Sequence, residues 1–135
     1  MNSNGEVYAM AISKAEAWIR EQFIKIFKKY IGKGPRVTEV KIFKKTLLVV
    51  FQDILTPLEK NLLSVGHNLE DVSKLRDKIA EPALKEYQQV LTDITGDKIV
   101  EVLCKNNFAS NERYYLFVFE NNIEALLKDK ADLNE

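Results

Sequence analysis

The stretch Gly32-Lys33-Gly34-Pro35 decides how this chain folds, because it separates a segment with helical apolar spacing from segments rich in β-branched residues. Gly32 can adopt the left-handed backbone conformation that closes a helix. Pro35 cannot continue a helix, and it favours extended geometry at Gly34. We therefore predict that one helix ends at this joint and that a β-hairpin begins after it.

Upstream of the joint, apolar residues recur at steps of three and four between Ala15 and Tyr30, and lysines lie off the stripe that they form. This spacing is typical of an amphipathic helix. Ser13 and Glu16 match a capping box, in which a hydroxyl and a carboxylate each accept a hydrogen bond from a backbone amide. The capping box predicts a helix start near Ser13, with residues 1–12 as a flexible or helical extension.

Two strands are predicted downstream of the joint. Residues 37–43 mix β-branched and polar side chains, whereas residues 46–51 are apolar on both faces. Lys44 and Lys45 lie between them and suit a solvent-facing turn. Because the second strand is apolar on both faces, we predict a central position in a sheet, with helices over one face and a partner subunit over the other.

Thr56, Pro57 and Glu59 predict the next helix start. They supply a cap, a proline at the first helical position and a carboxylate three residues after the cap. Gly66 ends this short helix. The combination indicates a helix boundary from local chemistry alone.

Asn68 and Asp71 predict the start of a second, longer helix, whose apolar positions stay in phase as far as Thr95-Gly96. Pro82 lies inside this pattern. A proline removes one backbone hydrogen bond and clashes with the carbonyl four residues earlier. Two alternatives therefore remain at this stage: one long helix with a kink near Pro82, or two helices broken at Glu81.

Residues 99–105 and 114–119 predict a second hairpin around the polar connection 106–113. Asn121-Asn122 can cap a short final helix, and residues 129–135 are predicted to form a loose tail. The predicted fold class is α+β: a single domain over residues 13–128. Its two β-hairpins form a mostly antiparallel four-stranded sheet, packed with the N-terminal helix and the long central helix or kinked helix pair. The strand order stays open.

Composition places the chain among ordinary globular proteins. Its 135 residues are 46% hydrophobic and 30% charged, and 20 basic residues balance 20 acidic ones. No apolar run approaches the roughly 18–20 residues that cross a bilayer. The first ten residues lack the pattern of a secretory signal, and a lone cysteine cannot form an internal disulfide. We therefore expect a cytoplasmic protein, with peripheral binding to the inner face of the membrane as a compatible location.

The residues that usually carry catalysis or bind metals are scarce. His67 and Cys104 are the sole histidine and cysteine, which argues against metal sites built from clustered imidazoles or thiolates. We interpret His67 as a turn residue and Cys104 as a small buried residue on the same strand face as Val100 and Val102. Four carboxylates are candidates for a cluster: Glu59, Glu70, Asp71 and Asp77. Capping and helix-dipole roles explain Glu59, Glu70 and Asp71 without any substrate. We expect no enzymatic activity and no cofactor.

The joint also suggests two binding hypotheses. Its glycines and Lys33 resemble fragments of a phosphate loop, but such a loop follows a strand and starts a helix, whereas this joint follows a helix. The neighbouring basic residues form a candidate interaction surface, hereafter the basic surface: Lys28, Lys29, Lys33 and Arg36. A protein partner is the favoured interpretation, and weak nucleic-acid binding by the basic N-terminal half, with strand aromatics such as Phe43, is the alternative.

Several short motifs follow one another along the chain: Lys29–Pro35, the strand Leu47–Phe51, the helix start Leu55–Glu59, Arg76, and Thr95–Val100. In this order and spacing they resemble the bacterial MpsC family. The resemblance spans about residues 13–120. It implies an accessory protein in membrane bioenergetics or in linked ion and inorganic-carbon uptake, and it supplies no catalytic residue.

The exposed apolar character of the predicted sheet suggests self-association. A strand that is apolar on both faces and an amphipathic first helix offer more apolar surface than one short sheet covers. We therefore expect a homodimer.

Overall fold

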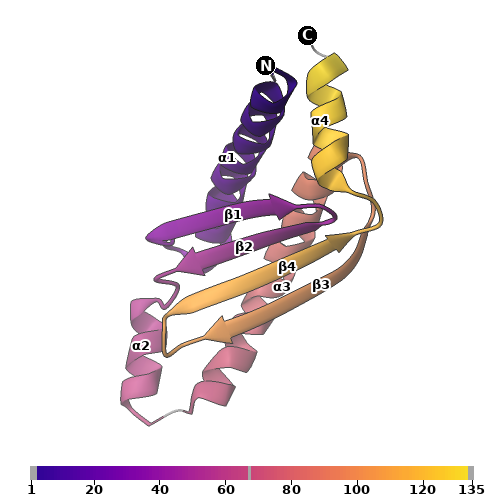
Figure 1. Cartoon of the computed structure of the whole chain (residues 1–135). Helices are drawn as coiled ribbons and strands as arrows, with labels where there is room; N and C mark the ends of the chain where they lie inside the picture. The colour runs from indigo at the N-terminus through magenta and orange to yellow at the C-terminus, as the bar shows by residue number, and fades with distance from the viewer. Residues whose placement is uncertain (1–2, 67, 134–135) are drawn as a thin grey trace.

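A computed structural model describes residues 3–66 and 68–133, with backbone alone for residues 3–10 and 131–133. The order of elements matches the predicted alternation of helices and hairpins (Figure 1). The elements are α1 (Ser3–Ile31), β1 (Val37–Phe43), β2 (Thr46–Gln52), α2 (Pro57–Ser64), α3 (Leu69–Thr95), β3 (Ile99–Asn107), β4 (Glu112–Phe119) and α4 (Ile123–Leu133).

The four strands form one antiparallel sheet in the order β1-β2-β4-β3. Each predicted hairpin is therefore present, and the two hairpins join through β2 and β4. β2 lies at the centre of the sheet, as its two-sided apolar sequence predicted. The α+β class is confirmed.

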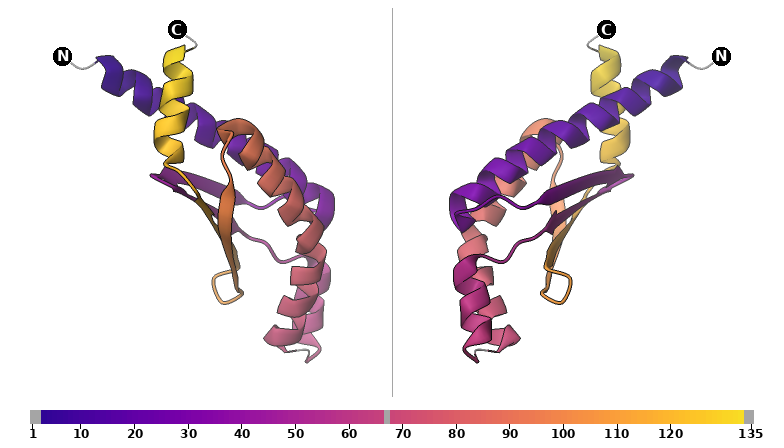
Figure 2. Two further views of the ribbon diagram at one scale, coloured as in Figure 1. Left: turned by 90° about the vertical axis from the view of Figure 1, so that its right-hand side faces the viewer. Right: turned by 90° about the vertical axis from the view of Figure 1, so that its left-hand side faces the viewer.

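The helices cover a single face of this sheet. Figure 2 views the sheet nearly edge-on and shows α1 and α3 on one side of the strands, with α4 beside the N-terminal half of α1. The core between these layers is rich in aromatic rings: Phe23 of α1 stacks on Tyr87 of α3 with centroids 4.3 Å apart, and Phe27 approaches Phe51 of β2 at 4.8 Å. None of the helices in the described part of the chain has the length and apolar character needed to cross a membrane.

The capping box predicted at Ser13 is absent, whereas the helical alternative for the N-terminal segment is confirmed from Ser3 onward. The helix runs continuously from Ser3, so Ser13 lies inside it and does not cap it. Glu16 has a tertiary role instead, because its Oε2 accepts a hydrogen bond of 2.9 Å from the backbone amide of Ile42 in β1. Ile42 lies on an edge strand, and the carboxylate thus satisfies a backbone donor that no neighbouring strand reaches.

α3 is one continuous helix through Pro82, which decides between the two alternatives. Asn68 caps its start as predicted, with Oδ1 accepting from the amide of Asp71 at 2.8 Å. Pro82 is exposed, while Ala80 and Ala83 on either side of it are buried. Core packing before and after the proline therefore holds both halves in one helix despite the lost hydrogen bond.

The second hairpin is longer than predicted, because β3 extends to Asn107 and β4 begins at Glu112. A bulge between Ile99 and Glu101 changes which residues face the helices. Val100 has no partner residue in β4 at the bulge, so the regular alternation that predicted a common face for Val100, Val102 and Cys104 does not extend to Val100. At the C-terminus, α4 continues to Leu133, and residues 129–133 are therefore helical.

Candidate functional site

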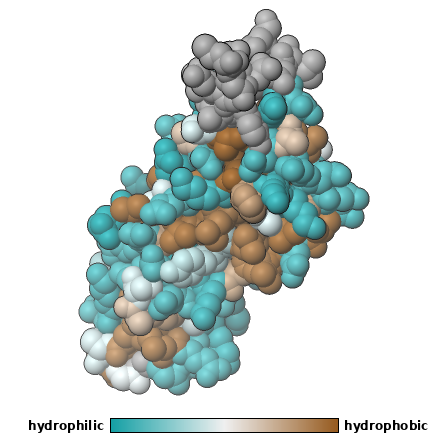
Figure 3. Space-filling view, viewed as in Figure 1, coloured by the Kyte–Doolittle hydropathy of each residue, from teal (hydrophilic) through white to brown (hydrophobic). Residues whose placement is uncertain are grey.

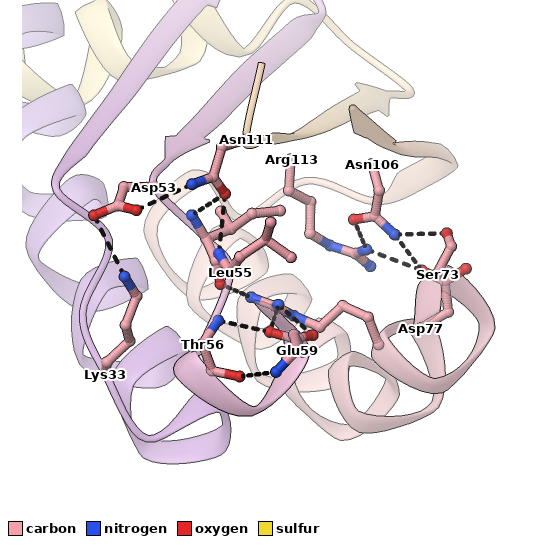
Figure 4. Close-up of polar contacts among 12 residues, drawn as sticks. Lys33, Asp53, Leu55, Thr56, Glu59, Ser73, Asp77, Asn106, Asn111 and Arg113 are labelled. Atoms are coloured by element: carbon pink, nitrogen blue, oxygen red, sulfur yellow. Dashed lines mark hydrogen bonds and ion pairs between the residues drawn. The ribbon is translucent and has the colours of Figure 1, made fainter. Parts of the chain in front are cut away.

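The predicted joint is a helix stop. Gly32 has a φ of 91°, and its amide donates to the carbonyl of Lys28 at 3.0 Å. Lys33 then reaches Asp53, just after β2, with Nζ 3.3 Å from Oδ2 (Figure 4). Hydrogen bonding to Lys33 lowers the pKa of the Asp53 carboxyl. The joint is thus fastened to the end of the first hairpin.

Asn111 organises the other side of this region, and the sequence reasoning missed it. It lies in the turn between β3 and β4 with a φ of 56°. Its Oδ1 accepts from the amides of Ile54 and Leu55, both at 3.0 Å, and its Nδ2 donates to Asp53 at 3.0 Å. Asparagine tolerates left-handed geometry better than most residues, which is the local signal that could have identified the turn.

The predicted start of α2 is confirmed, and it contains a buried ion pair. Thr56 and Glu59 form the capping box, with hydrogen bonds of 3.2 and 2.8 Å between side chains and backbone amides. Glu59 also accepts from Nη1 of Arg76 at 2.6 and 2.7 Å, and Nη2 of Arg76 donates to the carbonyl of Ile54 at 2.7 Å. Arg76 therefore joins α3 to α2 and to the segment that precedes α2.

The four cations of the basic surface lie at the end of α1 and around the joint. Lys28 and Arg36 are exposed, and Arg36 donates from Nη2 to Gln52 Oε1 at 3.3 Å. Lys29 forms an ion pair of 3.1 Å with Glu86 of α3. Because Lys29 and Lys33 each pair with a carboxylate, Lys28 and Arg36 carry the positive charge that remains on this surface.

A cleft of about 320 Å³ opens between α3 and the β3–β4 hairpin. The buried side chain of Arg113 lines this cleft. Its Nη1 donates to Asp77 at 2.9 Å and to Asn106, and its Nε donates to the Tyr115 hydroxyl at 2.8 Å. Figure 4 shows Arg113, Asn106 and Asp77 converging, with Ser73 nearby. The carboxylate of Asp77 offsets the guanidinium charge, so the cluster binds the hairpin to α3.

Cys104 lines this cleft and is exposed, so the prediction that it is buried was wrong. The cause is the position of β3, which is an edge strand that the helices cover incompletely. Partial desolvation still raises the pKa of the thiol, against an opposing effect of the nearby Arg113. His67 lies outside the described residues.

The predicted carboxylates do not gather into one site. Glu59 binds Arg76, whereas Asp77 binds Arg113. Glu70 pairs with Lys74 one helical turn later. Among the residues that the structure describes, no three side chains of histidine, cysteine, aspartate or glutamate lie close enough to hold a metal ion.

The sheet face opposite the helices is called here the outer face, and no helix or strand that the structure describes covers it (Figure 1). In Figure 3 it carries apolar residues across the middle of the sheet, bordered by hydrophilic ones. Leu48 and Leu103 point from this face with 39% and 51% of their surface exposed.

Comparison with known proteins identifies one family. The model described as "Na+-translocating membrane potential-generating system (MpsC)" matches residues 12–121. An uncharacterized protein of Bacillus subtilis (strain 168), YbcI, is 23% identical over 101 residues, which cover 75% of this chain and 82% of the relative. No solved structure matches the chain.

Proposed function

This chain belongs to the MpsC family, and from that membership we propose that it is a non-catalytic accessory protein of a membrane-potential-generating system. The family description suggests a role related to membrane potential. In our proposal the chain acts in the cytoplasm or at the inner face of the membrane, where it binds a protein of the system and forms a homodimer. Sodium translocation itself belongs to that partner, and coupled uptake of ions or inorganic carbon is a compatible setting.

The observation that supports a binding role is the geometry of the basic surface. Lys28 and Arg36 are exposed cations on either side of a joint that is held in place by Asp53 and Gln52. A surface that is already ordered loses little conformational entropy on binding. An acidic patch on a cytoplasmic segment of the membrane system is the complementary partner.

A genetic assay with matched variants tests this proposal. We expect deletion of the gene to reduce the sodium-dependent part of the membrane potential, measured with a potential-sensitive dye with and without sodium. The wild-type chain should restore it, whereas the variant Lys28→Glu with Arg36→Glu should not. Both substitutions leave the Lys29 and Lys33 ion pairs in place.

Lys14→Glu with Lys45→Glu is the control, because both lysines are exposed, lie away from the joint, and give the same change in net charge. The control should restore the potential. Co-purification from detergent-solubilised membranes should follow the same order. Equal restoration by both double variants would contradict a role for the basic surface, and an unchanged potential in the deletion strain would contradict the proposed function itself.

No structural observation favours nucleic-acid binding. The carboxylates of Glu86 and Asp53 offset two of the four cations on the basic surface. Phosphate contacts depend steeply on salt, so filter binding of single strands at low and moderate salt distinguishes this alternative. We expect no retention at low salt.

A further inference from the structure

The outer face contains a central apolar area that the chain itself leaves open to water. Strand register places Leu48, Leu116 and Leu103 side by side on β2, β4 and β3. Val50 and Val118 flank this row on the same face, one on each side of it. A sheet with one face against helices usually presents polar residues on the other, so a continuous apolar area here indicates an interface.

Charged side chains on this face lie on the two edge strands and, at one end of the central strand β4, at Glu112, which accepts a hydrogen bond from the Tyr114 hydroxyl. The register fixes their positions. Glu39 of β1 and Lys105 of β3 lie at opposite ends of one row across the sheet, through Val50 and Tyr114. In the described part of the chain, neither Glu39 nor Lys105 forms an ion pair. One edge of the row is thus negative and the other positive.

The neighbouring row, through Leu48 and Leu116, ends in Lys41 on β1 and in Leu103 on β3. The face therefore has an apolar centre, and the row through Val50 and Tyr114 has ends of opposite charge. Such a row is complementary to a reversed copy of itself.

We propose that the outer face is the interface of the homodimer, and that two copies stack their sheets about a two-fold axis parallel to the strands. This inference rests on the homodimer of the proposed function and adds its surface and geometry. Rotation about this axis reverses the order of the strands, and each row of residues keeps its position along the strand direction. β1 of one copy therefore faces β3 of the other, and β2 faces β4. Leu48 meets Leu116 of the second copy, and Glu39 meets Lys105 of the second copy, each contact occurring twice.

The other way of stacking the same faces is less favourable. A two-fold axis across the strands, along the row of Leu48 and Leu116, would place each strand over its own copy. Lys105 would then face Glu101 of the second copy, so the number of opposite-charge contacts would be unchanged, but Lys41 would face Lys41 of the second copy. Opposed like charges at an interface are destabilising. The parallel axis instead places Lys41 over Leu103, where its aliphatic stem can lie along an apolar surface.

The apolar contact is tested by the mass in solution. Light scattering coupled to size exclusion should give twice the 15.6 kDa of one chain. Leu48→Lys should shift the mass to that of one chain while the far-ultraviolet circular dichroism stays unchanged. Leu58→Lys is the matched control, because Leu58 is an exposed leucine on α2, outside the sheet, and it should leave the dimer intact.

The axis is tested by charge reversal. Glu39→Lys and Lys105→Glu should each weaken dimerisation roughly tenfold, because each creates two repelling contacts of modest energy. Their combination should restore the wild-type dissociation constant. In the rejected arrangement Lys105 would face Glu101 of the second copy, and rescue would instead require Lys105→Glu with Glu101→Lys.

The outcomes separate the surface from the oligomeric state. A wild-type chain that stays at 15.6 kDa up to millimolar concentration overturns the homodimer and this inference with it. A dimer that withstands Leu48→Lys overturns the assigned surface alone. Rescue by Glu101→Lys and not by Glu39→Lys overturns the parallel axis.

Discussion

Replacing Glu59 with glutamine should destabilise the fold strongly, because it leaves the charge of Arg76 buried without a compensating charge. The two side chains expose 10% and 1% of their surface, and Nη1 of Arg76 lies 2.6 and 2.7 Å from the two carboxylate oxygens. Glutamine still suits its position in the capping box. The substitution therefore removes the charge and keeps the helix cap.

The expected loss is about 3–5 kcal/mol, the typical cost of removing one partner from a buried ion pair. Arg76→Met should cost a similar amount, because it leaves the Glu59 carboxylate buried. The double variant should cost less than the sum of the two, since no unpaired charge remains. Such a loss is a large fraction of the stability of a domain of this size.

Urea unfolding followed by circular dichroism measures these free energies. Glu70→Gln is the matched control: it removes the same charge from an ion pair with Lys74 whose side chains expose 76% and 70% of their surface. Its expected cost is about 0.3–0.5 kcal/mol. If Glu59→Gln and Glu70→Gln lowered the free energy of unfolding equally, the reasoning about the buried pair would be refuted. Strictly additive effects in the double variant of Glu59→Gln with Arg76→Met would also count against it.

Three further predictions follow from single side chains. Asn111→Gly keeps the left-handed turn but removes the acceptor for two backbone amides, and should lower the free energy of unfolding by about 1–3 kcal/mol; an unchanged urea midpoint would contradict this. Burial raises the pKa of Tyr115 to about 12. The neutral hydroxyl is thus favoured in the folded state. The contribution of Tyr115 to the free energy of unfolding is fully present below pH 10, and about 3 kcal/mol should be lost as the pH rises to 12. Tyr115→Phe should remove this contribution, and an equally steep alkaline loss in that variant would argue against it. The raised pKa of the Cys104 thiol predicts slower reaction with a disulfide reagent at pH 8 than free cysteine shows, so a faster reaction would contradict it.

Local sequence chemistry predicted most boundaries correctly. The joint at Gly32, the cap at Thr56 and the turn at Lys44 all appear where the residues indicated them. Each signal depends on contacts within a few positions of the chain, such as a hydroxyl and the amide three residues later. Hydrophobic spacing likewise predicted that Phe23 and Tyr87 face the core.

The errors arose where a local signal had competing explanations. Ser13 and Glu16 match a capping box, yet the helix continues upstream and Glu16 binds β1. Cys104 shares a strand face with Val102 as predicted, but incomplete cover over an edge strand leaves it exposed. Neither outcome can be read from spacing, because both depend on which element lies opposite.

The sequence by itself determined the order of helices and hairpins, since backbone preferences and apolar periodicity act over a few residues. Only the tertiary structure decided the strand order and the partners of Arg76, Asn111 and Arg113. The contacts of Arg76 with Glu59, of Arg113 with Asp77 and of Asn111 with Ile54 join residues 17, 36 and 57 positions apart. Their existence depends on how the sheet brings distant segments together, and the same long-range arrangement leaves the outer face open.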